Sequence, residues 1–272
     1  MGDEPVYYVE GDDEGMAQAG ALARRTFKFL WRELSWEYRR IIPALEMFAV
    51  KVPFENEDRH DGEPECEHMW IDEIEFDGDE VRGTLLNEAQ RIESLTAGTS
   101  VSTPLEDIGD WMYSTGGKVY GAFTVNYMRA KMPPRERSAH DRAWGLKFGN
   151  PETIKVAPGR RQRRGFVNRL FASEPEPPSL EELERTEHPA SENMAAKIEE
   201  TLTSNPSTVI DVDDDGWSML HRESLAGNLT PVKILVAHGA DCALKTPSGY
   251  TALDLARKMG WPLVVEHLEN NR

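Results

Sequence analysis

The chain contains little of what marks secreted, metal-binding or membrane-spanning proteins. Its 272 residues include two cysteines, Cys66 and Cys242, which lie far apart in the sequence. Two distant cysteines indicate neither a disulfide framework nor a cysteine-rich zinc site, so we expect a reducing compartment. No segment approaches the run of roughly 18 apolar residues that a transmembrane helix needs. The first residues lack the pattern of a signal peptide, and we therefore expect a cytoplasmic protein that does not enter a membrane.

Basic residues are also in short supply. The chain has 31 lysines and arginines against 48 aspartates and glutamates, which gives a formal net charge of -17. Nucleic acids and anionic membranes both present negative surfaces, so this excess of acid disfavours general binding to either. An acidic protein instead attracts a basic surface. We expect a protein partner of that kind.

Recognisable catalytic motifs are absent as well. We find no serine elbow, phosphate loop or His-Glu-x-x-His helix, and nothing in the sequence indicates a cofactor or a metal site. One polar grouping stands out, because His68, Trp70 and Asp72 alternate onto one face of a predicted strand. If Asp110 and Trp111 approach them, the group could bind a cation or perform acid–base chemistry. The interpretation that we prefer is a polar strand face whose two indoles cap the core.

The first half of the chain predicts one helix followed by short strands. Residues 16–39 carry apolar side chains at helical spacing, namely Ala23, Phe27, Leu30, Trp31 and Leu34. Strands are expected at 47–54, 68–76, 80–86, 98–103, 110–113 and 119–125. This order predicts an α+β domain in which a small, strongly bent antiparallel sheet or an SH3-like barrel follows the helix.

Four segments of this region form an ordered series of motifs. They are FAVKVPF at 48–54, EHMWID at 67–72, IGDWMY at 108–113 and GAFTV at 121–125. With these motifs, residues 20–150 resemble the YegJ-like family of bacterial domains of unknown function, the domain of unknown function 2314 family. The resemblance implies a bacterial origin and a compact α+β domain. It implies no particular activity.

The C-terminal part of the chain repeats with a period of 33. The superposed pairs are Gly216 and Gly249, Leu220 and Leu253, Gly227 and Gly260, Val232 and Val265, and Leu235 and Leu268. Each copy predicts two short helices, the first of which ends at a glycine. The first copy closes with His-Gly-Ala-Asp at 238–241, and the stretch resembles ankyrin repeats. That resemblance implies an all-α stack with a protein-binding surface.

Two copies are fewer than the roughly three that such a stack normally needs. We expect the missing unit at 191–212, as a degenerate cap with a helix over 192–205, before repeats at 213–245 and 246–272. Three residues depart from the ankyrin pattern, and they are Met219, Glu223 and Asp254. Glu223 is predicted to face inward, where a buried carboxylate needs a partner such as Arg257. The alternative is that Glu223 marks a contact site.

The turns of the repeats supply the candidate partner-binding residues. Asp214, Asp215 and Trp217 lie at one turn, and Ser248 and Tyr250 lie at the equivalent turn of the next copy. In an ankyrin-like stack they line up along one edge, where we expect exposed aromatic side chains among carboxylates to contact a basic partner. Together with Glu223, these residues form the predicted binding surface.

The segment between the two domains changes charge twice. Lys155–Arg169 contains six basic and no acidic residues, and the following stretch is rich in glutamate and proline. The basic part could contact RNA or a phosphate group, but we prefer a solvated linker. The predicted organisation is an acidic tail at 1–15, the α+β domain at 16–150, the linker at 151–190 and the repeats at 191–272.

Binding is the function that these observations favour. We expect a non-catalytic adaptor or inhibitor whose repeats hold a protein partner, for example an immunity protein that blocks a basic toxin. The alternative is an enzyme that acts on a small molecule through His68, Asp72 and Asp110.

Overall fold

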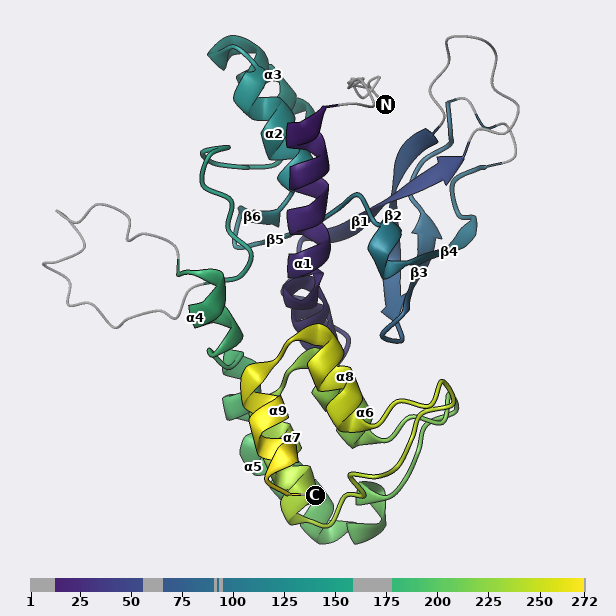
Figure 1. The fold of residues 1–272 in the computed structure, drawn as a ribbon. Coiled ribbons are helices and arrows are strands. Elements are labelled where there is room, and N and C mark those ends of the chain that lie inside the picture. The colour runs from purple at the N-terminus through teal and green to yellow at the C-terminus, as the bar shows by residue number, and fades with distance from the viewer. Residues whose placement is uncertain (1–12, 56–65, 91, 93–94, 159–177, 272) are drawn as a thin grey trace, which may run out of the picture. The chain divides into compact units, whose positions relative to one another are not determined.

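The computed structural model describes residues 13–55, 66–90, 92, 95–158 and 178–271 of the chain. The chain forms two compact units, each drawn in Figure 1. The first comprises Met1–Leu30 and Glu37–Pro158, and the second comprises Trp31–Trp36 and Gly159–Arg272. Residues 1–12 of the expected acidic tail lie outside the described residues. So does the part of the predicted basic-then-acidic linker between 159 and 177.

The first element is the long helix α1 (Glu14–Glu37). It begins at Asp13, whose carboxylate oxygen Oδ1 accepts hydrogen bonds from the backbone N–H groups of Gly15 and Met16. An aspartate at this position supplies acceptors for N–H groups that the helix itself leaves unpaired. The residues predicted from the helical spacing are all buried, namely Ala23, Phe27, Leu30, Trp31 and Leu34.

A six-stranded antiparallel sheet follows, with the strand order β4-β3-β2-β1-β5-β6 (Figure 1). Its strands are β1 (Met47–Glu55), β2 (Cys66–Phe76), β3 (Glu80–Leu85), β4 (Ser100–Pro104), β5 (Asp110–Thr115) and β6 (Lys118–Gly121). A short 3-10 helix, η1 (Leu105–Asp107), connects β4 to β5. Because β4 and β6 lie at opposite ends of the order, the described strands form an open sheet and not the alternative SH3-like barrel.

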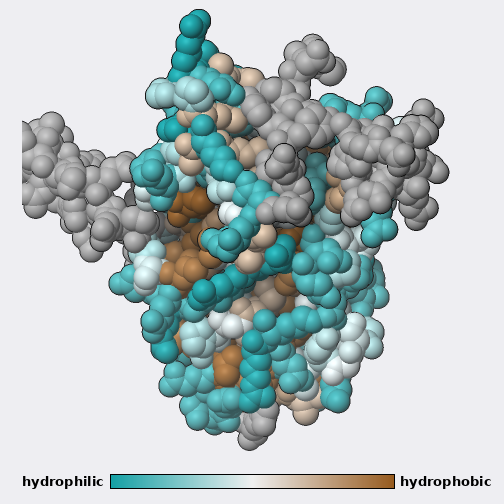
Figure 2. All heavy atoms as spheres, turned by 45° about the horizontal axis from the view of Figure 1, so that its top comes forward, coloured by the Kyte–Doolittle hydropathy of each residue, from teal (hydrophilic) through white to brown (hydrophobic). Residues whose placement is uncertain are grey.

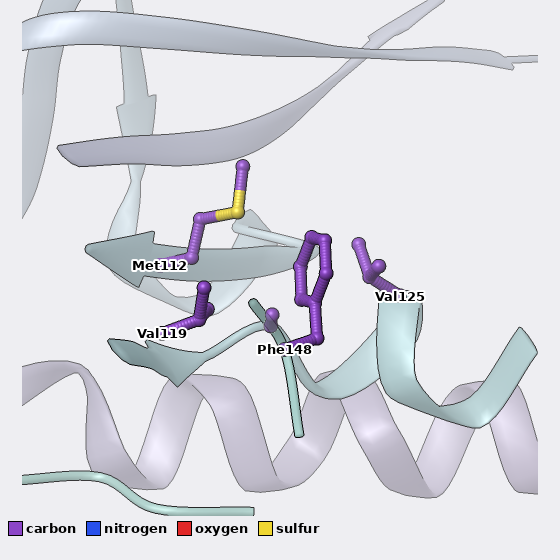
Figure 3. Close-up of a cluster of buried hydrophobic side chains, with 5 residues drawn as sticks. Met112, Val119, Val125 and Phe148 are labelled. Carbon is purple, nitrogen blue, oxygen red and sulfur yellow. The ribbon is translucent and has the colours of Figure 1, made fainter. Parts of the chain in front are cut away.

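Hydrophobic side chains cover both faces of this sheet. On one face lie Val50, Ile71 and Trp111, and the Trp111 indole donates from Nε1 to the backbone oxygen of Ala23 in α1 at 2.9 Å. The opposite face carries a smaller cluster of buried side chains, which are Met112, Val119, Ala122, Val125 and Phe148. Figure 3 shows Met112, Val119, Val125 and Phe148 gathered around this second core.

The predicted strand at 119–125 is wrong in its second half. β6 stops at Gly121, Ala122 adopts a left-handed φ of 57°, and helix α2 (Phe123–Lys131) starts at the next residue. The turn is stabilised from a distance, because the Asp110 carboxylate in β5 accepts the backbone N–H groups of Phe123 and Thr124. A cap from another strand leaves no signal in the local sequence. A further helix, α3 (Pro134–Trp144), follows α2.

The described residues of the second unit form helices and two isolated backbone bridges. Its elements are α4 (Leu180–Glu184), α5 (Pro189–Ser204), η3 (Pro206–Val209), α6 (Met219–Ala226), α7 (Leu229–Ala237), α8 (Ala252–Met259) and α9 (Pro262–Glu269). Helix α6 packs beside α8, while α7 packs between α5 and α9. The helices therefore form two rows, and α5 lies where the degenerate first unit was expected.

The repeat is present in the backbone as well as in the sequence. One bridge joins Val212 to Ser218, and the other joins Lys245 to Thr251, which are the equivalent positions of the next copy. Ser218 caps α6 and Thr251 caps α8, each by accepting the N–H of the third helical residue. Gly227 ends α6 with a φ of 74°, and a Cβ there would lie 2.3 Å from the Trp261 ring. Glycine is required at this position by both its conformation and its neighbour.

Candidate functional site

The polar residues predicted on β2 do share one face of the sheet. His68, Trp70 and Asp72 lie on the face opposite the buried Ile71. Trp70 is half-buried against the Trp144 ring, with 6.2 Å between ring centroids, and adjoins the second core. His68 and Asp72 are four residues apart on one strand, a separation of about 13 Å. They are too far apart to act on one atom.

Asp110 has a structural role. It is fully buried, and its carboxylate accepts hydrogen bonds from the backbone of Trp111, Phe123 and Thr124 and from the Thr124 hydroxyl, at 2.6–2.9 Å. Burial raises the pKa of Asp110, while the Thr124 hydrogen bond and the charge of Lys51 oppose the rise. Four donors occupy this carboxylate, so it is not placed to serve as a general base.

Trp111 does not join the grouping. Because neighbouring residues of a strand point to opposite faces, Trp111 lies on the face that carries Ile71 and packs towards α1. Its indole is fully buried and stacks on Tyr113, with ring centroids 6.1 Å apart. The structure therefore does not bring together the five residues proposed as a ligand site.

Lys51 was missed by the sequence analysis. It stands opposite Trp70 on one side and Asp110 on the other, and its amine lies 5.9 Å from the Trp70 ring centroid. Burial lowers the pKa of Lys51, and the negative charge of Asp110 opposes this effect. The sequence could have indicated Lys51, which lies between Val50 and Val52 in a strand of alternating side chains. This alternation places Lys51 on the face of the sheet that carries the polar residues of β2.

His68 lies next to this lysine. Its Cδ2 is 3.1 Å from where a Cβ on Gly109 would lie, and its Nδ1 is 3.7 Å from the sulfur of Cys66. The protein packed around the ring, and then the charge of Lys51, lower the pKa of His68 to about 4, although part of the side chain is exposed. At neutral pH His68 is therefore uncharged.

The described part of the chain contains no group of side chains arranged to bind a metal ion. No three histidine, cysteine, aspartate or glutamate side chains group there as metal ligands. Across the same residues, no helix combines the length and the apolar character that crossing a membrane requires. On the face that Figure 2 shows, hydrophilic side chains predominate and hydrophobic ones occupy smaller areas.

The turns of the second unit present some of the predicted partner-binding residues but not all of them. Asp214, Asp215 and Ser248 are exposed, and Tyr250 is half-buried beneath the amine of Lys258, 5.0 Å from its ring centroid. Trp217 is only 5% exposed. The expectation of an exposed indole at this turn was wrong.

The burial of Trp217 has a local cause. Its ring packs against the imidazole of His221 and beneath the guanidinium of Arg222, whose carbon lies 4.7 Å from the ring centroid. The same guanidinium binds the carboxylates of Asp213 and Asp215, at 2.7 Å and 2.9 Å. Arg222 therefore covers the indole and neutralises part of the acidic turn.

Glu223 is also inaccessible to a partner, with 2% of its surface exposed. It faces inward as expected, but Arg257 is not its partner. Asn228 donates from Nδ2 to the Glu223 carboxylate at 2.7 Å, whereas Arg257 binds Glu269 at 2.5 Å. The Asn228 side chain also accepts a hydrogen bond from the Trp36 indole at 2.9 Å. Glu223 belongs to a buried polar network.

Exposed aliphatic residues beside the first turn were missed. Ile210 is 66% exposed and Val212 is 52% exposed, and they alternate with Asp211 and Asp213 just before Asp214. Among the described residues, nothing donates a hydrogen bond to the carboxylates of Asp211 and Asp214. The alternation of aliphatic residues and aspartates in this segment is typical of a strand. It therefore did not predict that Ile210 and Val212 would be exposed to solvent. We call Ile210–Asp215 the acidic turn.

The chain is similar to proteins from bacteria and from humans. The chain is 42% identical over 269 residues to the "Putative ankyrin repeat protein NMB1133/NMB1171" of Neisseria meningitidis serogroup B (strain ATCC BAA-335 / MC58), an alignment covering 99% of this chain and 98% of that protein. It is 29% identical over 91 residues to the "Uncharacterized protein YegJ" of Escherichia coli (strain K12), covering 34% and 56% of the two chains. A 57-residue match, 37% identical, to human "Protein phosphatase 1 regulatory subunit 27" covers 21% of this chain and 37% of that protein. A family model matches residues 13–148, and the chain belongs to that family, "Uncharacterized protein conserved in bacteria (DUF2314)".

Proposed function

We propose that this chain is a protein-interaction protein that holds a partner on an ankyrin-like stack in its second unit. The stack is supported by a period of 33 residues, which the sequence, the helix caps and the backbone bridges all share. The relative named as an ankyrin repeat protein, aligned over nearly the whole chain, supports the same architecture. Repeats of this kind use their edges and concave faces for binding.

The acidic turn is the observation that carries the proposal. It combines exposed aliphatic side chains, Ile210 and Val212, with carboxylates at Asp211 and Asp214 that have no hydrogen-bond donor among the described residues. Apolar contact supplies binding free energy, and the carboxylates select a partner of opposite charge. The partner that fits is a protein with a basic surface and an apolar centre.

The role of such a complex is that of an adaptor or an inhibitor in a bacterial cell. A net charge of -17 suits the covering of a basic active site. An immunity protein that blocks a basic toxin is one case of this mechanism. In each of these roles the acidic turn is the surface proposed to bind the partner, whereas Trp217 and Glu223 are buried.

The test uses the intact chain as bait in a lysate of its native host, followed by binding measurements with the purified captured protein. The variant is Ile210→Ser with Asp214→Asn, which removes one exposed aliphatic side chain and one carboxylate. The control is Met194→Ser with Glu200→Gln, which removes one exposed apolar side chain and one exposed carboxylate, the latter paired with Lys197, from α5.

We expect a stoichiometric partner whose affinity falls about tenfold in the first variant and less than about twofold in the control. The affinity should also fall as salt is raised, because exposed charges are screened. A partner that binds both variants alike would contradict the assignment to the acidic turn. The absence of any stoichiometric partner would contradict the proposed function.

A further inference from the structure

A groove of about 780 Å³ opens on the first unit, away from the residues discussed above. It is lined by parts of β2, β3 and β4 together with Tyr38 and Phe48. Its volume lies within the range of roughly 300–1,000 Å³ that is usual for small-molecule sites. None of the candidate ligand-site or partner-binding residues named from the sequence lines it.

Two aromatic rings form an apolar part of the lining. Tyr38 is 52% exposed, and its ring meets that of Phe48 edge-on, with centroids 6.2 Å apart. The Tyr38 hydroxyl donates to the backbone oxygen of Ile74 at 2.6 Å, which fixes the ring and occupies the polar group. The ring surface that stays open can attract a cation through its electron-rich face.

Two carboxylates stand at the same groove. Glu73 accepts a hydrogen bond from the Thr84 hydroxyl at 2.7 Å. Glu75 lies directly opposite Arg82 in the strand register, but that guanidinium binds Asp77 at 2.5 Å. Among the described residues, nothing donates a hydrogen bond to the Glu75 carboxylate. Burial, and next the charge of Glu75, raise the pKa of the Tyr38 hydroxyl, so this carboxylate lies close enough to Tyr38 to act on its hydroxyl group electrostatically.

The backbone of β2 is bent where these side chains emerge. The register shifts between Asp72 and Glu75, and Glu73 adopts a φ of 51°, which is strained for any residue but glycine. On β3, Gly83 is required, because a Cβ there would lie 2.5 Å from the backbone oxygen of Asp72.

Beyond this bulge the side chains of β2 alternate again. Glu73 and Glu75 are exposed, and Ile74 between them is fully buried, so the two carboxylates lie on the same face of the strand. Both residues line the groove together with Tyr38.

We propose that this groove binds a small organic cation, an ammonium or guanidinium group carried on an apolar body. The cationic group lies between Glu73 and Glu75 and over the Tyr38 ring, and the apolar body contacts Phe48 and Val101. This site is separate from the acidic turn, so it gives the first unit a binding role of its own. An anionic ligand of the same size is repelled by both carboxylates.

The test uses the full chain and two probes that share a benzene ring but carry opposite charges. Benzyltrimethylammonium is titrated in one arm and benzoate in the other, and the backbone amide NMR signals of Gly83 and Val101 report occupancy. We expect saturable shifts with benzyltrimethylammonium at concentrations of about 1 mM. No saturable shift below about 10 mM, or equal binding of benzoate, would overturn the proposal.

Variants separate the charge from the ring. Glu73→Gln with Glu75→Gln should weaken binding of the cation about tenfold, because both charges are lost while an acceptor for Thr84 is kept. The matched control, Glu106→Gln with Asp107→Asn, removes two exposed charges from η1 and should change the affinity less than about twofold. Equal affinity in the Glu73 and Glu75 variant and in this control would overturn the assignment.

Tyr38 provides an independent check. Tyr38→Phe keeps the ring and should retain binding, whereas Tyr38→Leu should weaken it about threefold. If Tyr38→Phe and Tyr38→Leu lose affinity equally, the hydroxyl and not the ring is responsible. That outcome would overturn the contact between the cation and the ring.

Discussion

Replacing Asp110 tests whether this carboxylate holds the first unit together. Asp110→Ala removes the acceptor of four hydrogen bonds and keeps the backbone of β5. Two of the donors are the N–H groups of Phe123 and Thr124, which begin α2. We expect a large loss of stability, localised first at the turn between β6 and α2.

The magnitude follows from the burial of these groups. Each buried donor without an acceptor costs about 1–3 kcal/mol, and replacing a capping aspartate costs about 1 kcal/mol more. Water can enter the space that the carboxylate leaves and accept hydrogen bonds from some of these donors. We therefore expect Asp110→Ala to lower the free energy of unfolding of the first unit by about 3–5 kcal/mol. Asp110→Asn retains one acceptor oxygen and should lose about half as much.

Hydrogen exchange measured by mass spectrometry suits a chain with two units, because it reports the stability of each segment separately. A single unfolding curve would combine the stabilities of the two units. The amides of residues 123–126 should lose protection in Asp110→Ala, while those of α8 should not. Asp107→Ala, an exposed aspartate three residues away, is the control and should leave exchange unchanged. A loss below about 1 kcal/mol, with normal protection at the start of α2, would refute a structural role for Asp110.

Two further predictions concern a histidine and a pair of helix caps. The imidazole of His68 should titrate near 4, not near the ordinary 6.5, in a proton NMR titration, and Lys51→Met should raise that pKa. Because the folded pKa is the lower one, His68 contributes stability that is present above about 6.5 and is lost as the pH falls through about 4. Stability that stays flat across this interval would contradict the low pKa. Ser218→Ala and Thr251→Ala remove equivalent caps from α6 and α8, so each should lower the free energy of unfolding of the second unit by about 1 kcal/mol in urea denaturation. A cap whose loss has no measurable effect would contradict the equivalence of the two copies.

Burial and secondary structure were predicted well for residues in segments with a regular pattern of apolar side chains. Phe27 and Leu34 were assigned to the buried side of a helix from spacing alone, and both are buried in α1. Five of the six predicted strands were placed within two or three residues of their observed ends. Gly227 was correctly assigned to the end of α6, because a glycine after a short apolar helix is a local signal.

Residues whose role depends on particular side-chain contacts were predicted poorly. Trp217 lies at a turn, where an aromatic side chain was expected to be exposed, but Arg222 and His221 cover it. Glu223 was expected to need a partner such as Arg257, but Arg257 binds Glu269, and the Glu223 carboxylate accepts a hydrogen bond from the Asn228 amide. Neither outcome follows from spacing, because each depends on which side chains come into contact in the folded chain.

The sequence by itself therefore determined the main helix, most strands, the period of the C-terminal repeat and the acidic balance of charge. These features arise from local conformational preference, from the alternation of polar and apolar residues, and from composition. Only the tertiary structure decided that Asp110 caps α2, that Trp217 is buried and that Glu73 and Glu75 share a groove with Tyr38. These are relations between residues on different elements, and the periodicity within one element does not encode them.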